Sequence, residues 1–444
     1  MQKTITKGYD IKIKGKAEQE IALLNCDKVA YTLSDFNYLK PKVLIKEGDT
    51  VKKGTPIICD KKNPDVVLVS PVSGKIESIN RGDRNLLLHV IINKEGEESE
   101  THDKINTTEI ANMDSRLVKE ALLKRGLWPY IRRRPYNKIA LTNEEPKCIF
   151  INAIDSSPIS ADPEFYLKDR IEDFKTGVAA LSKLCPTIHI CTNGDIGSSI
   201  FSAPGAQDHQ FSGKHPKGNL SVHINNIEPI VNNEKIIWSL RAQDVVAMGK
   251  SLSSGEFDSE RVFAWAGPAA KERKYYKSYL GASTSSLPKE DGEIRLISGS
   301  VLSGTQLDEN GFLGFYDNTV IALKEGRERK ILGWLKPGFD SESLTRCYVS
   351  NIKPQKEYDH TTSNNGEFRA IVDSEMYDRV QPLDIHTIFL YKALLAEDIE
   401  EAERLGLWSV MPEDFALASY MDPSKNNFGS AIKTILDMLH KEEN

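Results

Sequence analysis

Long apolar runs are absent from this sequence. No stretch of about 18 apolar residues occurs, so no segment is predicted to span a bilayer. The first residues, MQKTITKGYDIKIKGK, lack an apolar core and a small-residue cleavage site, and this excludes a secretory signal. A net charge of −6 over 444 residues is too mild to indicate a nucleic-acid partner. We therefore expect a protein that stays in the cytoplasm and binds no nucleic acid.

Cysteine is also scarce. Among the six cysteines no two lie two or three residues apart, which excludes a local iron–sulfur or zinc-ribbon motif. Cys185 and Cys191 are close enough in sequence to meet in space, but buried free thiols in a reducing compartment are the expectation. What is present is typical of a soluble globular protein: 39% of residues are hydrophobic and 27% are charged. A domain prior of about 150 residues predicts three domains.

Residues 45–79 contain two similar half-motifs, each with a short apolar stretch beside residues that permit tight turns. Gly48 and Gly54 punctuate the first half, and Gly74 follows the apolar stretch 66–69 of the second half. Two such halves joined by a hairpin predict a flattened β-sandwich. The pattern resembles the biotinyl/lipoyl carrier fold.

The tip of the predicted hairpin decides between a carrier and a structural part. Carriers present a lysine at the tip between small residues or methionines. Counting back from Pro71, that position falls on Asn63 or one residue away. Lys61 and Lys62 are near but lack the flanking pattern, and Pro64 stiffens the tip. A structural use is favoured. A carrier enzyme modified on Lys61 or Lys62 is the alternative, and it predicts an added mass on the intact chain.

Strand-like and helix-like segments alternate in the middle of the chain. A helix is expected over 115–125, a short apolar strand over 148–154, a helix with one apolar face over 167–184, and another strand over 187–191. This β-α-β order predicts a Rossmann-like open sheet with a right-handed crossover.

The last part of the chain changes character twice. Short strands between Gly-rich turns predict a small α+β domain from about residue 260 to 338. Helices are then expected over 382–395 and 398–405, and an apolar stripe predicts one more helix near the end of the chain. That stripe consists of Ile432, Ile435, Leu436 and Leu439.

Several short segments, in one order along the whole chain, resemble a known family. The chain is similar to the A subunit of the Na⁺-translocating NADH:quinone reductase, a family related to the flavin-binding NADH subunit of respiratory complex I and to the C subunit of the Rnf complex. The matching segments are Lys7-Gly, Asp60-Lys-Lys-Asn-Pro, Ser70-Pro-Val-Ser-Gly-Lys, Gly126-Leu-Trp, Arg132-Arg-Arg-Pro-Tyr, Gly213-Lys-His-Pro-Lys-Gly, Ile297-Ser-Gly-Ser-Val-Leu-Ser-Gly and Pro382-Leu-Asp.

The resemblance implies an α/β multidomain fold. Its parts are a biotinyl/lipoyl-like β-sandwich with the N-terminal segment, a Rossmann-like α/β domain, a small β-grasp-like (soluble ligand-binding) domain, and a connecting segment with a C-terminal helical domain. In that order, the expected domain limits are 1–110, 111–258, 259–345 and 346–444.

Features of the related redox proteins are missing from this chain. Where those relatives place a Gly-rich loop that lets a flavin phosphate approach, residues 128–134 are bulky, and Pro129 offers no N–H. Their Glu-rich flavin turn is replaced by Ile154-Asp-Ser-Ser-Pro158, and the stretch 418–423, which matches their cluster-binding tail, has no cysteine. The resemblance therefore implies that this chain binds no flavin and no iron–sulfur cluster.

The family implies a peripheral subunit on the cytoplasmic side of the bacterial inner membrane. The complex would couple NADH oxidation and quinone reduction to Na⁺ export, with FMN, riboflavin, FAD and iron–sulfur centres on partner subunits and quinone as the substrate. The chief expected partner is the membrane subunit that carries covalent FMN. The isolated chain should be colourless and should not oxidise NADH. A purely structural assembly role is the alternative.

The vacated flavin position supplies the quinone-contact candidates, because aromatic faces stack on flat rings and guanidinium groups can hydrogen-bond a quinone carbonyl. In the alternative interpretation, the aromatic residues fill the core and the arginines bind carboxylates or lipid phosphates. No catalytic, cofactor-binding or metal-binding residue is predicted. The candidates are Trp128, Tyr130, Arg132, Arg133, Arg134, Tyr136 and Lys138.

Two further motifs resemble sites but lack required features. His209, His215 and His223 do not have the spacing or partners of a zinc site, and the stretch around them is interpreted as a loop with solvated charge. The glycine-rich stretch 298–304 lacks the lysine of a phosphate loop.

Overall fold

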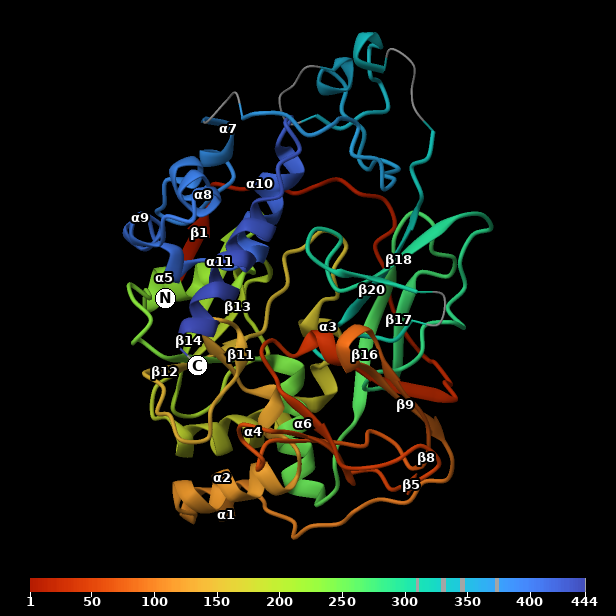
Figure 1. Ribbon diagram of the computed structural model, residues 1–444, viewed down its shortest axis with the longest axis vertical. Helices are drawn as coiled ribbons and strands as arrows, with labels where there is room; N and C mark the ends of the chain where they lie inside the picture. The colour runs from red at the N-terminus through yellow and green to blue at the C-terminus, as the bar shows by residue number, and fades with distance from the viewer. Residues whose placement is uncertain (309–310, 329–332, 344–347, 372–374, 444) are drawn as a thin grey trace.

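The computed structural model describes residues 1–308, 311–328, 333–343, 348–371 and 375–443. The chain forms a mixed α/β protein with four sheets and a helical C-terminal part (Figure 1). Of the described helices, none has the length and apolar character needed to cross a bilayer. Cys347 lies outside the described residues. The other five cysteines are free and buried, as the sequence predicts.

The N-terminal sandwich consists of a four-stranded and a three-stranded sheet, as the two half-motifs predict. Its turns and alternating apolar residues produce short strands whose inner faces hold the buried side chains Ile58, Leu68, Ile76 and Val90. At the hairpin tip, Thr142 Oγ1 donates to Asn63 Oδ1 at 3.2 Å, so the tip lies against the next domain. The strands are β3 (Lys28–Thr32), β4 (Pro41–Val43), β5 (Thr50–Val51), β6 (Pro56–Asp60), β7 (Val67–Val69), β8 (Gly74–Arg81) and β9 (Leu87–Lys94).

A seven-stranded sheet, in the order β1-β14-β13-β12-β15-β10-β11, forms the centre of the molecule. The first five strands of that order, from β1 through β14, β13 and β12 to β15, are parallel to one another. The order of the strands along the chain reverses between β12 and β15. The strands are β1 (Gln2–Ile5), β10 (Arg132–Arg134), β11 (Lys138–Ile139), β12 (Cys148–Asn152), β13 (Ile188–Asn193), β14 (Ala206–Gly213) and β15 (Ile237–Arg241).

Helices cover both faces of this sheet, because its strands are apolar on both sides. On one face, Ile149 and Ile151 belong to the core that includes α2 (Ser115–Lys124), α4 (Ile171–Leu184) and α6 (Ala242–Ser254). On the other face, Phe150 packs with α5 (Leu220–Ile227) and the helical tail.

Two glycines allow α4 and α6 to cross closely. A Cβ at Gly249 would lie 1.8 Å from the carbonyl oxygen of Asp173, and one at Gly177 would lie 2.2 Å from that of Val245.

The third sheet and the tail complete the fold. The sheet has the strand order β19-β18-β20-β16-β17-β2. Its strands are β2 (Glu18–Leu23), β16 (Glu260–Ala266), β17 (Lys274–Tyr279), β18 (Ile294–Ser298), β19 (Thr305–Leu307) and β20 (Thr319–Lys324). The tail contains α7 (Glu375–Asp378), α8 (Thr387–Leu395), α9 (Ile399–Arg404), α10 (Ala416–Met421) and α11 (Phe428–Glu442), so each helix expected from the sequence is present.

The first 23 residues lie outside the sandwich that follows them. β1 pairs with β14 of the central sheet, and β2 pairs with β17 of the third sheet. Between them, the backbone N–H of Gly8 donates to the carbonyl oxygen of Arg379 at 3.0 Å. The N-terminal segment therefore ties three parts of the molecule together.

A partly buried carboxyl group joins the sandwich to the loop that precedes β20 of the third sheet. Asp35 Oδ2 accepts a hydrogen bond from the backbone N–H of Phe315 at 2.8 Å. Burial, together with the nearby charge of Asp317, raises the pKa of Asp35 from 3.8 to about 7. Since the folded state holds this proton more tightly than the unfolded chain, the contribution of Asp35 to stability is lost as the pH rises from 3.8 to about 7.

We expect Asp35→Asn to stabilise the chain above pH 7, because the amide oxygen can still accept from Phe315 without carrying a charge. The gain should be about 1–4 kcal/mol at pH 8 and should fade toward pH 4. Denaturant unfolding at several pH values measures it. The matched control is Asp83→Asn at an exposed turn. A loss of stability at pH 8 in Asp35→Asn would contradict the assignment.

Candidate functional site

The predicted quinone-contact segment, residues 128–138, lies where all the parts of the molecule meet. It contains a short 3-10 helix, η3 (Trp128–Tyr130), followed by β10 and β11. β10 pairs with β15 and with β11, which fixes the direction of each side chain. The segment is thus a buried edge of the central sheet.

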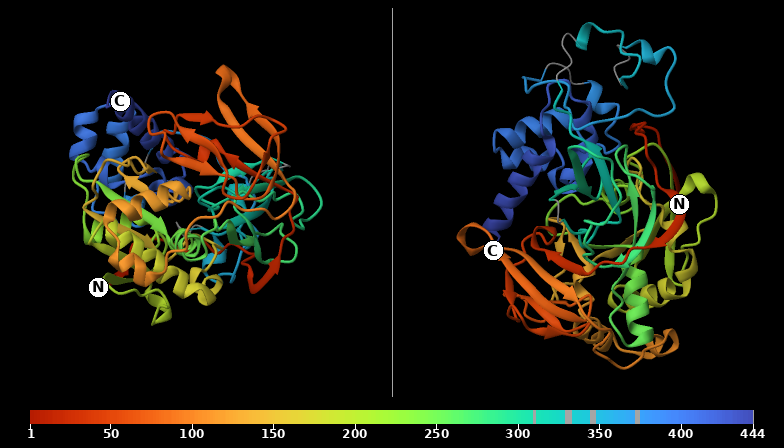
Figure 2. Two further views of the ribbon diagram at one scale, coloured as in Figure 1. Left: turned by 90° about the horizontal axis from the view of Figure 1, so that it is seen from below. Right: turned by 90° about the vertical axis from the view of Figure 1, so that its right-hand side faces the viewer.

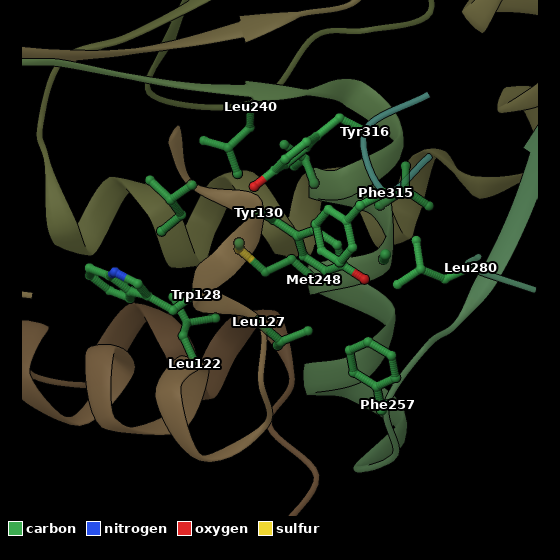
Figure 3. Close-up of a cluster of buried hydrophobic side chains, with 14 of the residues drawn as sticks. Leu122, Leu127, Trp128, Tyr130, Leu240, Met248, Phe257, Leu280, Phe315 and Tyr316 are labelled. Carbon is green, nitrogen blue, oxygen red and sulfur yellow. The ribbon is translucent and has the colours of Figure 1, made fainter. Parts of the chain in front are cut away.

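The aromatic residues Trp128 and Tyr130 are 1% and 0% exposed. Trp128 Nε1 donates to the carbonyl oxygen of Ala140 at 2.7 Å, and the ring stands edge-on to Trp238. The ring of Tyr130 stacks on Phe315 with 5.3 Å between centroids (Figure 3). Both side chains fill the core, as the alternative interpretation of the sequence predicts.

Two of the three arginines form ion pairs within the protein. Arg133 contacts Glu144 at 3.2 Å, and Arg134 contacts Glu413 of the tail at 2.9 Å. Arg134 also donates to Ser221 at 3.3 Å. Because these charges are paired and buried, removing one partner of either pair leaves an uncompensated charge.

Tyr136 and Lys138 bind the last helix. The hydroxyl group of Tyr136 donates to Glu443 Oε1 at 2.5 Å, and Lys138 Nζ lies 3.4 Å from His440 Nδ1. Burial, with the charge of Arg133 beside it, lowers the pKa of Lys138 to about 8. The end of α11 lies beside the sandwich in Figure 2, and Tyr38 donates to Asp437 there at 2.7 Å.

Arg132 differs from the other six candidates. Its guanidinium carbon lies 4.5 Å from the ring centroid of Tyr316, and no hydrogen-bond acceptor contacts its guanidinium among the described residues. Burial and the neighbouring charge of Arg241 lower the pKa of Arg132. It is partly accessible, so it retains donors for another molecule.

A polar cavity of about 310 Å³ lies at the carboxyl edge of the same sheet. Its wall includes Asp155, Ser156, Asp162, Asp195 and Lys217, from the loops that follow β12, β13 and β14. In the sequence, the first of these loops stands out only for the glutamates it lacks. The position of the three loops in the sequence, directly after predicted strands, could have indicated the cavity, because ligands of open α/β sheets bind outside the carboxyl ends of strands.

Polar contacts fix the cavity wall. Lys217 Nζ is ion-paired with Asp195 and lies 3.0 Å from Asn193 Oδ1. Ser156 Oγ lies 3.0 Å from His215 Nδ1 and accepts from the backbone N–H of Gly218 at 2.8 Å. These bonds hold the wall in one arrangement.

The histidine-rich stretch around the cavity is not a solvated loop, contrary to the sequence interpretation. His215, Lys217 and His223 are buried, and His223 lies on α5. His209 Nε2 lies 3.0 Å from His189 Nδ1. In the described parts of the chain, no three His, Cys, Asp or Glu side chains are grouped so that they could hold a metal ion.

Comparisons with known proteins match three successive segments of the chain to one family. Residues 3–95 match the NqrA N-terminal barrel-sandwich hybrid domain, 113–257 the NqrA second alpha/beta domain, and 262–309 the NQRA C-terminal domain. The A subunit of the Na(+)-translocating NADH-quinone reductase of Haemophilus influenzae (strain 86-028NP) is 39% identical over 99% of each chain. The chain belongs to the NqrA family. The Histophilus somni (strain 2336) member is also 39% identical over 99% of each chain.

Solved structures add nothing to this family assignment. A chain of an NAD⁺-reducing [NiFe]-hydrogenase in the air-oxidized state aligns over 77% of the NqrA-family chain and 68% of its own length. The identity is 12% and the TM-score is 0.40, which is too low to support an argument.

The packing of the segment predicts that Trp128→Ala destabilises the isolated chain by about 3–5 kcal/mol, because a fully buried ring is lost and a cavity remains. Urea unfolding measures the change. Phe389→Ala, which truncates a ring that is 64% exposed, is the control and should change stability by less than about 1 kcal/mol. Equal effects of the two changes would contradict the core position of Trp128.

Proposed function

We propose that this NqrA-family chain is a peripheral, cofactor-free subunit of a Na⁺-pumping NADH:quinone oxidoreductase. Such a complex couples NADH oxidation and quinone reduction to Na⁺ export. The observation that carries the proposal is the 39% identity over 99% of both chains to proteins named as the A subunit of that reductase. The chain acts on the cytoplasmic face of the bacterial inner membrane, and the membrane subunit with covalent FMN is its chief partner.

The finer fold labels belong to the same proposal. Parallel strands with helices on both faces support a Rossmann-like label for residues 111–258. We assign a β-grasp-like label to residues 259–345, a biotinyl/lipoyl-like label to the sandwich in 1–110, and a helical label to the tail in 346–444.

Crowding of the second domain supports placing the redox groups elsewhere. Trp128 and Tyr130 occupy the place where the related redox proteins keep a Gly-rich flavin loop, and both side chains are fully packed. FMN, riboflavin, FAD and the iron–sulfur centres would therefore reside on partner subunits. Absorption spectra of the purified chain test this directly, since stoichiometric flavin or iron would contradict it.

The contribution to quinone binding is proposed for residues 128–138. Because six of the seven candidates have partners inside the protein, the contact runs through Arg132 and the ring of Tyr316 beside it. A purely structural role is the second candidate, and the paired side chains of Arg133, Arg134 and Tyr136 favour it. The quinone-binding role and the purely structural role differ in whether quinone reaches Arg132.

An azidoquinone added to the intact complex should label a peptide that contains residues 128–138, and an unmodified quinone should compete with the label. Peptide mapping by mass spectrometry locates the adduct. Label confined to other subunits, or to surfaces that quinone does not protect, would leave the chain with the structural role alone.

Docking to the membrane subunit is proposed for one end of the molecule, at the top of Figure 1. There η6 (Gly333–Leu335) and η7 (Val349–Asn351) are tied by a hydrogen bond from Val349 N to Pro337 O. Leu335, Phe339 and Ile352 are 62%, 62% and 85% exposed. Several large apolar side chains exposed on one segment are typical of protein contacts.

The double variant Phe339→Ser and Ile352→Ser should move most of the chain from the membrane fraction to the soluble fraction, because the apolar contact is lost. Washed membranes that contain the other subunits provide the assay. Phe389→Ser changes an equally exposed ring elsewhere and should remain bound. Retention of the double variant would exclude this surface.

A further inference from the structure

Two arginines stand side by side on β10 and β15, next to the point where the strand order of the central sheet reverses. Arg132 of β10 lies opposite Ser239 of β15, and Arg241 follows two residues later on the same strand. Residues two apart point to one face, so Arg132 and Arg241 are diagonal neighbours. Both contact Tyr316: Arg132 lies over its ring, and Arg241 donates to its carbonyl oxygen.

The acidic side chains around this pair do not balance it. Asp244 is the carboxylate whose charge acts on both arginines, and it is ion-paired with Arg261 at 3.2 Å. Arg134, which also faces Arg132, is neutralised by Glu413. Asp258 also acts on Arg261, but it is ion-paired with Arg170 at 2.7 Å, so the site retains an excess of positive charge.

The start of α6 adds to this charge. Arg241 is the N-cap residue of α6, and no side chain caps the helix there. The first turn of this 13-residue helix presents backbone N–H groups and the positive end of the helix dipole, which the carboxylate of Asp244 in the same turn offsets only in part. Like charges placed together and partly buried cost stability unless an anion lies between them.

We propose that Arg132 and Arg241 form a binding site for an oxyanion of the phosphate or carboxylate class. The planar guanidinium fork fits such groups with two parallel hydrogen bonds. Arg241 lies opposite Asn152 on β12, one residue before the wall of the polar cavity begins, so the rest of the ligand can extend along the carboxyl edge. This inference does not rest on the proposed quinone contact.

Titration of the isolated chain with inorganic phosphate and with acetate, at ionic strength held constant with chloride, tests the site. Calorimetry should detect saturable binding of at least one anion, and the preferred one separates a phosphate from a carboxylate ligand. Arg132→Gln should weaken binding by about tenfold or more. Arg84→Gln, at an exposed turn, is the matched control and should bind as the unchanged chain does.

A second measurement separates a ligand site from a structural contact. Without added anion, Arg132→Gln should melt at the same temperature as the unchanged chain or higher, because it removes an unpaired charge. A lower melting temperature, or binding of neither anion beyond that of chloride, would overturn the inference. If Arg132→Gln alters the KM for quinone in the complex while the chain binds no oxyanion, the quinone proposal survives and this one fails.

Discussion

The packing of residues 128–138 constrains the rest of the structure, because each part of the molecule supplies a partner to this one segment. The sandwich reaches it through Asn37, whose side-chain amide donates to the carbonyl oxygen of Asn137 at 3.2 Å. The third domain contributes Phe315 and Tyr316, and the tail contributes Glu413 and the end of α11. Moving any one part would expose apolar rings or leave a buried charge unpaired. The relative positions of the parts are thereby fixed at one place.

This arrangement makes the central α/β sheet a scaffold for the other parts of the molecule. A polar cavity lies at the edge above β12, β13 and β14. Arg132 lies on β10, on the other side of β15 from β12; it shares the packing of the segment but keeps unused donors. Neighbouring residues of one strand therefore differ in whether their side chains are paired within the protein.

Much of the fold follows from the sequence. A short apolar run predicted the strand at 148–154 and a helical periodicity predicted the helix at 167–184, because both patterns are strong and local; the structure has them at 148–152 and 171–184. Sequence alone cannot distinguish Arg132, Arg133 and Arg134, because Glu144 and Glu413 reach two of them only through the tertiary structure. The same limit applies to Lys217, whose burial depends on Asp195. Nor does any local pattern show that β1 joins a sheet whose other strands begin about 130 residues later.

The contact between Tyr136 and Glu443 has a consequence for how the chain is made. A protein is synthesised from its N-terminus onward, so a domain whose contacts are all local in sequence can fold during synthesis. Here the partners of Arg134, Tyr136 and Lys138 lie about 280 to 310 residues further along the chain, and β1 pairs with the much later strand β14. The contacts of this central segment can therefore form only after α11 has been synthesised. A product truncated before that helix would expose the surface of the segment that α11 covers in the complete chain.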